Sequence, residues 1–240
     1  MKTKQLILIA FIAFIAVSCH FDLNLGQVDG NRNVQTEERN MNSDFTQIKA
    51  SSGLKVILEE GATQKVVVEA DSNLLPIIET YVENGVLRIR TEENIRNASS
   101  KKVYVTYTTL TEVKASSGSD VIIKDLIKNE NLSLDASSGA NIEADVFSKD
   151  LYLEASSGAN LDISGKTKML RTKASSGGLI DAENLLSVRC EARASSGGNI
   201  SVSVKEHLEA KASSGGNIDY YGEPTVQSAS KNYSGAINKM

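Results

Sequence analysis

The sequence is poor in the residues that build a conventional globular core. Only 12 of its 240 residues are aromatic, five Phe and seven Tyr, and it has no Trp. Proline, cysteine and histidine occur twice each. A core of large rings, a disulfide framework and a Cys/His metal cluster are therefore disfavoured, and no metal or cofactor is predicted.

An excess of one charge is also missing. The 26 basic and 30 acidic side chains leave a formal net charge of −4, so no nucleic-acid partner is predicted. With 40% hydrophobic and 23% charged residues, the chain has the composition of a globular protein, and its 240 residues are enough for one large or two small domains. Collagen, coiled coils and proteins with many membrane spans are excluded.

A lipoprotein signal peptide is predicted at the N-terminus. Two lysines precede an apolar run from Leu6 to Val17, which is too short to span a bilayer, and small residues and Cys19 follow. Residues 1–18 are expected to be removed and Cys19 to carry a lipid. The alternative is that Cys19 only follows the cleavage site and stays free. Residues 19–35 are polar and without pattern, and we expect a flexible tether there.

One tetrapeptide, by contrast, is abundant. Ala-Ser-Ser-Gly occurs seven times, and from the second copy onward it returns at a nearly constant spacing. The copies begin at Ala50, Ala115, Ala136, Ala155, Ala174, Ala194 and Ala212. Degenerate copies near residues 70, 91 and 232 would bring the total to ten repeat units.

The same alternation surrounds each copy. Apolar or small residues stand four and two positions before the Ala, as in Leu132 and Leu134, and six and eight positions after it, as in Ile142 and Ala144. A period of two predicts two short strands with one buried face, hinged at Ser-Ser-Gly. So short a unit leaves no room for a crossover helix. Residues 36–240 are therefore predicted to form an all-β, single-stranded parallel β-helix of about ten coils.

Stacked coils would bring equivalent residues into columns. The Ala would fill an inward corner, the Gly would relieve backbone strain at the bend, and the Ser side chains would hydrogen-bond from coil to coil. In two well-matched units this structural ladder comprises Ala136, Ser137, Ser138, Gly139, Ala155, Ser156, Ser157 and Gly158. An amide ladder is expected five positions after the Ala, at Asn141, Asn160, Asn199 and Asn217.

Two segments interrupt the pattern. Residues 74–80 are an apolar stretch that predicts a short helix, and residues 94–102 lengthen one unit and predict a surface loop. The irregular N-terminal units and the degenerate unit at Asn232 are candidates to cover the ends of the solenoid. Uncovered ends would expose strand edges to aggregation.

Several short segments follow one another in an order that matches a known family. They comprise Arg39, Phe45, Ile48, Val56, Ile57, Leu58, Gly61, Val66, Val68, Ala70, Asn73, Leu74, Asn84, Gly85, Val86, Leu87, Leu110 and Val113, followed by the copy at Ala115. This order resembles the head GIN domain family of exported, often lipid-anchored bacterial proteins, whose members are named putative auto-transporter adhesins. The resemblance spans about residues 35–235 and implies a right-handed single-stranded β-helix and a cell-envelope location, and it implies no catalytic residues. Together with the lipoprotein signal, it leads us to expect a lipid-anchored protein in the outer membrane.

The recurring serines are not predicted to be nucleophiles. A serine hydrolase uses one Ser beside a base that a third group orients, whereas here the same Ser returns in every unit and only His20 and His207 are available.

Charge columns are the remaining candidate sites. Seven positions after the Ala, an acidic column comprises Glu143, Asp162, Asp181 and Asp219, with Ser201 before the last of them. Stacked carboxylates would bind cations or a cationic ligand, or would only keep the surface solvated and screened by salt. The column one position before the Ala is mixed in sign, and Glu154 and Lys173 are expected to pair there.

These patterns favour a non-enzymatic cell-envelope lipoprotein, an adhesin or structural module. Its repetitive polar surface would bind a protein, a surface polysaccharide or another copy of the chain. The alternative is an extracellular carbohydrate-active enzyme on a β-helix, a polysaccharide lyase or hydrolase. Such an enzyme would have a loop-walled cleft with acidic or basic side chains grouped in one place.

Overall fold

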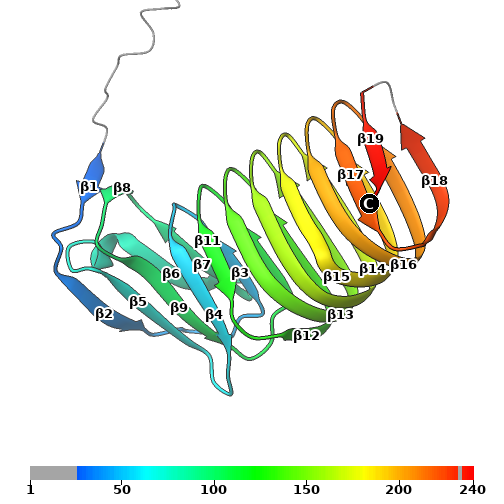
Figure 1. Ribbon diagram of the computed structural model, residues 1–240. Coiled ribbons are helices and arrows are strands. Elements are labelled where there is room, and N and C mark those ends of the chain that lie inside the picture. Colours follow the sequence, from blue (N-terminus) through cyan, green and yellow to red (C-terminus); the bar gives the residue numbers. More distant parts are fainter. Residues whose placement is uncertain (1–25, 232–233) are drawn as a thin grey trace, which may run out of the picture.

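The computed structural model describes residues 26–231 and 234–240, so the expected signal peptide, Cys19 and Asn232 lie outside the described residues. The molecule is an elongated, all-β solenoid with a group of N-terminal strands at one end (Figure 1). The predicted parallel β-helix is confirmed, but it has about six turns instead of ten.

The regular coil consists of strands that pair in parallel with their equivalents one coil further on. Between Glu112 and Ala212 the chain forms seven strands: β10 (Glu112–Ala115), β11 (Asp120–Ile123), β12 (Ile127–Ala136), β13 (Asn141–Ser156), β14 (Asn160–Ser175), β15 (Leu179–Ala194) and β16 (Asn199–Ala212). The last coil contains β17 (Asn217–Tyr221), β18 (Thr225–Lys231) and β19 (Ala236–Lys239). The two short strands expected per unit are joined into one long, bent strand in β13 to β16.

The buried face is the one that the alternation predicts. Ala136 pairs with Ala155 and Ala155 with Ala174, and all three are fully buried. Leu134 and Ile142 are also buried, at 0% and 1% exposure. Small and branched aliphatic side chains therefore fill the narrow interior, which explains why the chain needs so few aromatic residues.

Each Ser-Ser-Gly segment forms a tight β-turn. In the turn at residues 116–119, Ser117 and Gly118 have φ of 51° and 72°, and the Ser119 N–H donates to the Ser116 carbonyl at 3.1 Å. Two consecutive positive φ angles define a type I′ turn, which explains the Gly.

The contact between these turns is made by backbone. The Gly118 N–H donates to the Ser138 carbonyl of the next coil at 3.0 Å, and the Gly139 N–H donates to the Ser157 carbonyl at 3.1 Å. Within residues 26–231 and 234–240, no serine hydroxyl of one Ser-Ser-Gly turn bonds to a hydroxyl of the next. The expected serine side-chain ladder is therefore wrong, because the second Ser of each turn from Ser117 to Ser214 is exposed to solvent.

Spatial order departs from chain order in the N-terminal third. Strands β3 (Gln47–Ala50) and β4 (Lys55–Glu60) lie beside β10 and β11, with Ala50 opposite Ala115. On their other side lie β7 (Val86–Thr91) and β9 (Lys101–Tyr107), both parallel to them. After β4 the chain therefore forms further strands at the N-terminal end of the solenoid, in residues 65–107, and then returns to the other side of β3 and β4 to form β10 and β11.

The units expected at residues 70 and 91 are therefore not successive coils. Strand β5 (Lys65–Asp71) runs antiparallel between β9 and β2 (Val34–Arg39), and β6 (Ile78–Glu83) runs antiparallel to β7. The residue opposite Ala50 is Ile89. A period of two marks a strand with one buried face, whichever way its neighbour runs, so alternation alone gave the wrong coil count.

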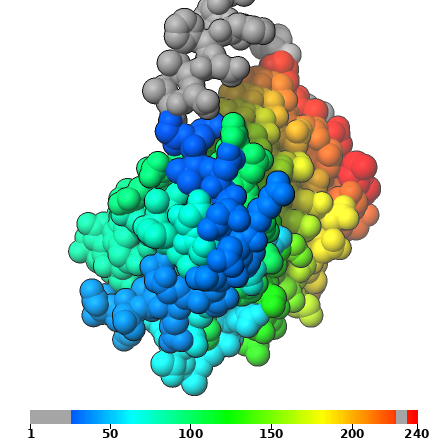
Figure 2. Space-filling model, turned by 90° about the vertical axis from the view of Figure 1, so that its left-hand side faces the viewer, coloured from blue at the N-terminus to red at the C-terminus, as the bar shows by residue number. Residues whose placement is uncertain are grey.

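The N-terminal strands cover one end of the coil. In Figure 2, which faces that end, the residues coloured blue to cyan lie in front of those of the later coils, coloured yellow to red. The outermost strand, β2, carries exposed Glu37 and Glu38, which discourage edge-to-edge pairing.

Three local predictions can be compared with this part of the structure. A short 3-10 helix, η2 (Leu75–Ile77), confirms the helix expected in residues 74–80. The loop expected at residues 94–102 contains β8 (Asn94–Asn97), which pairs with β1 (Gln27–Asp29). The expected tether of residues 19–35 thus includes β1 and the start of β2, because strand pairing orders polar segments that have no buried face.

A buried carboxylate fastens these end segments together. Asp71 is 0% exposed, and its Oδ2 accepts a hydrogen bond from the Arg32 N–H at 3.0 Å. The N–H groups of Ser99 and Ser100 donate to the same carboxylate at 3.2 Å. One side chain therefore holds the turn before β2 and the segment before β9.

We expect Asp71→Ala to lower the free energy of unfolding by about 2–4 kcal/mol, because it leaves buried backbone N–H groups without an acceptor. Asp71→Asn, which keeps one side-chain oxygen, should cost less. The measurement is urea unfolding followed by circular dichroism. Exposed Asp44 is the control, and Asp44→Ala should change little. Equal stability of the Asp71→Ala and Asp44→Ala variants would contradict the role given to Asp71.

Candidate functional site

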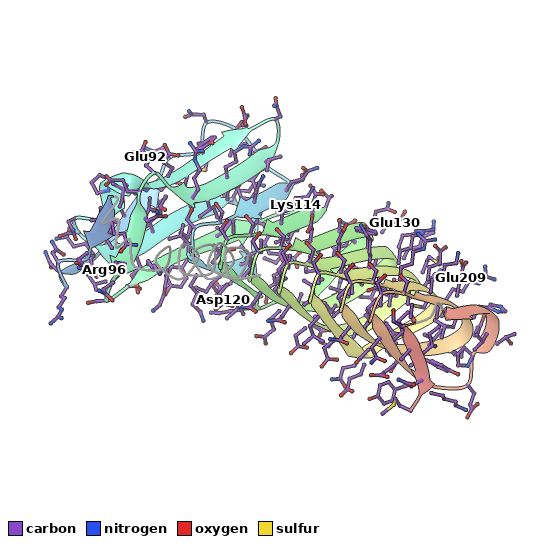
Figure 3. All side chains as sticks on the ribbon, turned by 90° about the horizontal axis from the view of Figure 1, so that it is seen from above. Glu92, Arg96, Lys114, Asp120, Glu130 and Glu209 are labelled. Atoms are coloured by element: carbon purple, nitrogen blue, oxygen red, sulfur yellow. The ribbon has the colours of Figure 1, made fainter. Side chains whose placement is uncertain are left out.

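The outer surface of the coil has three regions that differ in charge. One region follows each Ser-Ser-Gly turn, one precedes the next turn, and the third is the bend between them. Side chains project outward along the whole rod, from Glu92 and Arg96 at the N-terminal end to Glu209 near the other end (Figure 3). Among the described residues, no group of three or more His, Cys, Asp or Glu side chains is placed to hold a metal ion.

The region after each turn carries the acidic column. Glu143 lies opposite Asp162, Asp162 opposite Asp181, and Ser201 separates Asp181 from Asp219. None of these four carboxylates forms an ion pair within the part of the chain that the structure describes. We call this region the acidic face.

The amide ladder on the same side is interrupted. The Asn160 Nδ2 donates to the Asn141 Oδ1 at 2.9 Å, but the next position in the column is Leu179, which has no amide. Further on, the Asn217 Nδ2 donates to the Asp219 Oδ2 at 2.8 Å. The expected amide ladder is therefore confirmed between Asn141 and Asn160 and interrupted at Leu179. Asn199 and Asn217 lie opposite one another but share no side-chain hydrogen bond in the described part of the chain.

The region before each turn is dominated by ion pairs. The predicted pair is confirmed, with 2.7 Å between the Lys173 Nζ and the Glu154 Oε1. Partial burial raises the pKa of Glu154, but hydrogen bonds from Lys173 and Tyr152 lower it more, so the net pKa is below its usual value. Lys211 likewise pairs with Glu209 at 2.6 Å. These charges largely satisfy one another and leave little net field.

The serine turns show no catalytic arrangement. His207, the one histidine in the described ranges, lies in β16 five positions before Ala212 and opposite Arg189 in the neighbouring strand. The Cys190 thiol is buried, and burial raises its pKa, so it is not poised as a thiolate nucleophile.

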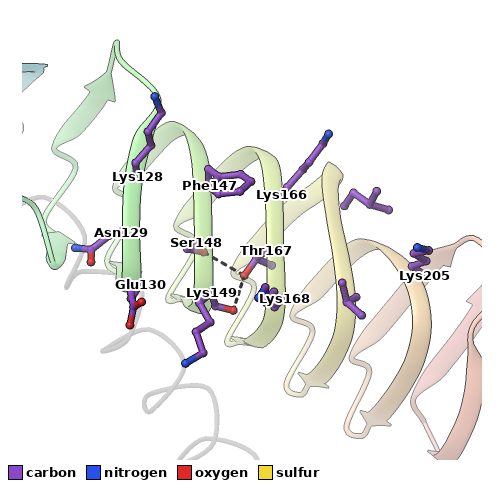
Figure 4. A pocket seen from close by; sticks show the side chains of 12 residues that line it. Lys128, Asn129, Glu130, Phe147, Ser148, Lys149, Lys166, Thr167, Lys168 and Lys205 are labelled. Carbon is purple, nitrogen blue, oxygen red and sulfur yellow. Dashed lines mark hydrogen bonds between the residues drawn. The ribbon is translucent and has the colours of Figure 1, made fainter.

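Sequence reasoning missed the third region, the bend at the far end of each coil. Phe147 lies there, midway between two successive Ser-Ser-Gly turns. Just inside the bend, the buried Ser148 Oγ donates to the Thr167 Oγ1 at 3.1 Å (Figure 4). Ser187, also buried, is opposite Thr167 in the next coil. A sequence signal for this bend was present: a Ser or Thr, namely Ser148, Thr167 and Ser187, recurs once in each of these units between two outward-facing residues.

The outward-facing residues of the bend line a shallow groove of about 620 Å³. Five lysines stand around three apolar side chains there, and Glu130 is the one acidic side chain that lines it. Phe147 is 57% exposed and Leu186 is 45% exposed. We call this region the lysine groove, and it comprises Lys128, Glu130, Phe147, Lys149, Lys166, Lys168, Leu186, Val188 and Lys205, with the inner residues Asn129, Ser148 and Thr167.

Comparisons with known proteins agree with this architecture. A family model described as "Putative auto-transporter adhesin, head GIN domain" matches residues 44–224. Among solved structures, a putative adhesin from Bacteroides fragilis has a TM-score of 0.83 at 20% identity, covering 89% of this chain and 100% of that one. A putative adhesin from Parabacteroides distasonis has a TM-score of 0.73 at 20% identity, with the same coverages of 89% and 100%.

A third similar structure, also from Parabacteroides distasonis, is named a putative lipid binding protein. Its TM-score is 0.63 at 18% identity, covering 89% of this chain and 96% of that one. No curated protein matches the chain. At 18–20% identity these structures show only that the fold is shared. Membership of the family is shown by the family model, which covers most of the chain.

For the acidic face, we expect Asp162→Asn to raise the free energy of unfolding by up to about 1 kcal/mol in low salt, because it removes repulsion between stacked carboxylates. The gain should vanish near 1 M salt, where the screening length falls to about 3 Å. Thermal unfolding measures it, with Asp150→Asn as the control, because Asp150 faces Arg171. If Asp162→Asn is destabilising and millimolar calcium raises the Tm of the unmodified protein, the acidic face is a cation site instead.

Proposed function

We propose a non-enzymatic binding role for this chain, which belongs to the head GIN domain family. It would be an adhesin or structural module of the cell envelope and would bind an extracellular partner through the outside of its solenoid. The observation that carries this proposal is the uniformity of the coil. Its turns are tight, and its outward-facing residues form columns along the rod, which do not bring an acid, a base and a nucleophile together at one point of the described structure.

The enzyme alternative finds less support in this geometry. A polysaccharide lyase or hydrolase needs a cleft with several acid-base groups around one bond. Long loops would have to wall such a cleft, yet between β13 and β16 the coil has only Ser-Ser-Gly turns and the bend. We therefore propose binding without cleavage.

We further propose that the protein is exported and held in the outer membrane by a lipid on Cys19. The apolar run before Cys19 supports this proposal, as does the start of β1 at Gln27, which leaves a short chain segment between the anchor and the N-terminal end of the solenoid. Among the described residues, no helix is long and apolar enough to cross a membrane.

The lipid anchor can be tested with the two cysteines of the chain. We expect a metabolically supplied alkyne fatty acid to label the protein in its native bacterium. Cys19→Ser should abolish the label and release the protein from the membrane fraction. The matched control is Cys190→Ser, which should leave the label unchanged because Cys190 is buried inside the coil. Labelling that persists in the Cys19→Ser protein would rule out the proposed anchor.

The binding role can be tested with the purified mature protein. On a panel of bacterial and host polysaccharides and extracellular proteins, we expect reproducible binding to at least one of them. No polysaccharide should be shortened, as followed by the release of new reducing or unsaturated ends. Repeated cleavage of one polysaccharide would overturn the non-enzymatic role, and absence of binding across the panel would leave only a structural role.

A further inference from the structure

We propose that the lysine groove binds an acidic polysaccharide whose chain lies along the axis of the solenoid. This inference rests on the proposed function and names the ligand class and the surface that would bind it. It is carried by charge, by exposed apolar surface and by the spacing of the coils.

The groove concentrates positive charge that is not paired within the described structure. Its five lysines are exposed, and none of them lies within ion-pair distance of an acidic side chain among the described residues. They are Lys128, Lys149, Lys166, Lys168 and Lys205, and Glu130 is the single opposing charge in the lining. Most other lysines and arginines of the coil are paired, so this patch is locally cationic on a chain whose net charge is −4.

Apolar side chains alternate with the lysines along the axis. Lys128 lies opposite Phe147, Phe147 opposite Lys166, and Lys166 opposite Leu186. Neighbouring coils are about 4.8 Å apart, so Lys128 and Lys166 are roughly 10 Å apart along the axis. That separation suits a polysaccharide with one carboxylate per disaccharide, and the intervening sugar would place its CH face on the exposed ring of Phe147.

The groove is also held rigid from beneath. The Thr167 Oγ1 accepts from the Ser148 Oγ and lies 3.3 Å from the Lys149 carbonyl, while the Ser187 Oγ donates to the Ser203 carbonyl at 2.8 Å. These bonds fix the bend that carries Phe147 and Leu186. A preordered surface loses little conformational entropy when a ligand binds.

Two other anionic surfaces fit the groove less well. A flat bilayer would need the apolar side chains to protrude, whereas here they line a hollow between lysines. The acidic face of a second copy offers carboxylates at the same coil spacing, but two chains of net charge −4 repel one another.

The test uses a hyaluronan decasaccharide, which has one carboxylate per disaccharide, and the same oligosaccharide with its carboxylates methyl-esterified. Isothermal titration with the mature protein should detect binding of the acidic form and at least tenfold weaker binding of the ester. The triple variant Lys128→Gln, Lys166→Gln, Lys168→Gln should bind about tenfold more weakly or worse. The control is Lys49→Gln with Lys101→Gln, two lysines outside the groove that form no ion pair with a described residue.

The apolar contribution has its own variant. Phe147→Ala should weaken binding of the decasaccharide several-fold and leave binding of inorganic polyphosphate unchanged. Circular dichroism and urea unfolding should show all variants folded, because the replaced side chains are exposed or, at Lys101, only half-buried. Supporting results are weaker binding of the decasaccharide by the triple and Phe147→Ala variants and unchanged binding by the control.

Three results would overturn the inference. The first is equal binding by the triple variant and the control, which would leave the proposed function standing if another ligand of the panel binds. The second is tighter binding to phosphatidylglycerol vesicles than to any acidic oligosaccharide. The third is salt-sensitive self-association that the triple variant abolishes, which would assign the groove to a second copy of the chain.

Discussion

The close stacking of one coil on the next is the constraint on which the rest of this structure depends. In three of the later coils the residue after the Ser-Ser-Gly turn is a glycine, and a Cβ added at Gly178, Gly198 or Gly216 would lie 2.4–2.5 Å from the backbone of the Ala one coil earlier. The same tightness explains the buried Ala column and the backbone bonds from each turn Gly to the next coil. Small side chains at the corner therefore let the backbones approach, and these approaches hold every outward-facing residue in its column.

In such a solenoid, a residue type that recurs at one position of the repeat forms a column on the surface. A carboxylate in each unit becomes the acidic face, a mixed pair becomes a row of ion pairs, and lysines beside a Ser or Thr become the lysine groove. Since like charges about 5 Å apart repel, a column of one sign persists only where solvent, salt or a ligand of opposite sign screens it. Among the described residues, the outside of the coil brings no acid, base and nucleophile together, which supports the proposed binding role.

The fold and the candidate sites can be predicted from the sequence where the repeat is regular, and not where it is irregular. From Ala115 onward the spacing of the tetrapeptide gave the strands, the buried face and the Glu154–Lys173 pair. It failed from Ala50 to Ala115, where β5 and β6 show the same alternation in an antiparallel sheet. It also missed Asp71, because one buried carboxylate among three separate segments has no sequence signature. The lysine groove was in principle readable, because Ser148 and Thr167 stand one repeat unit apart, each beside an exposed lysine.

The amino-acid sequence alone thus determined the class of fold, the direction in which each repeat side chain points and the columns to which repeated residues belong. These follow from local rules, namely a period of two and a constant unit length. Tertiary structure alone decided which strands flank the first coil, which serine atoms bond between coils and which lysines lack an acidic partner. Those outcomes depend on distances between residues far apart in the chain, and such distances exist only once the backbone has wound upon itself.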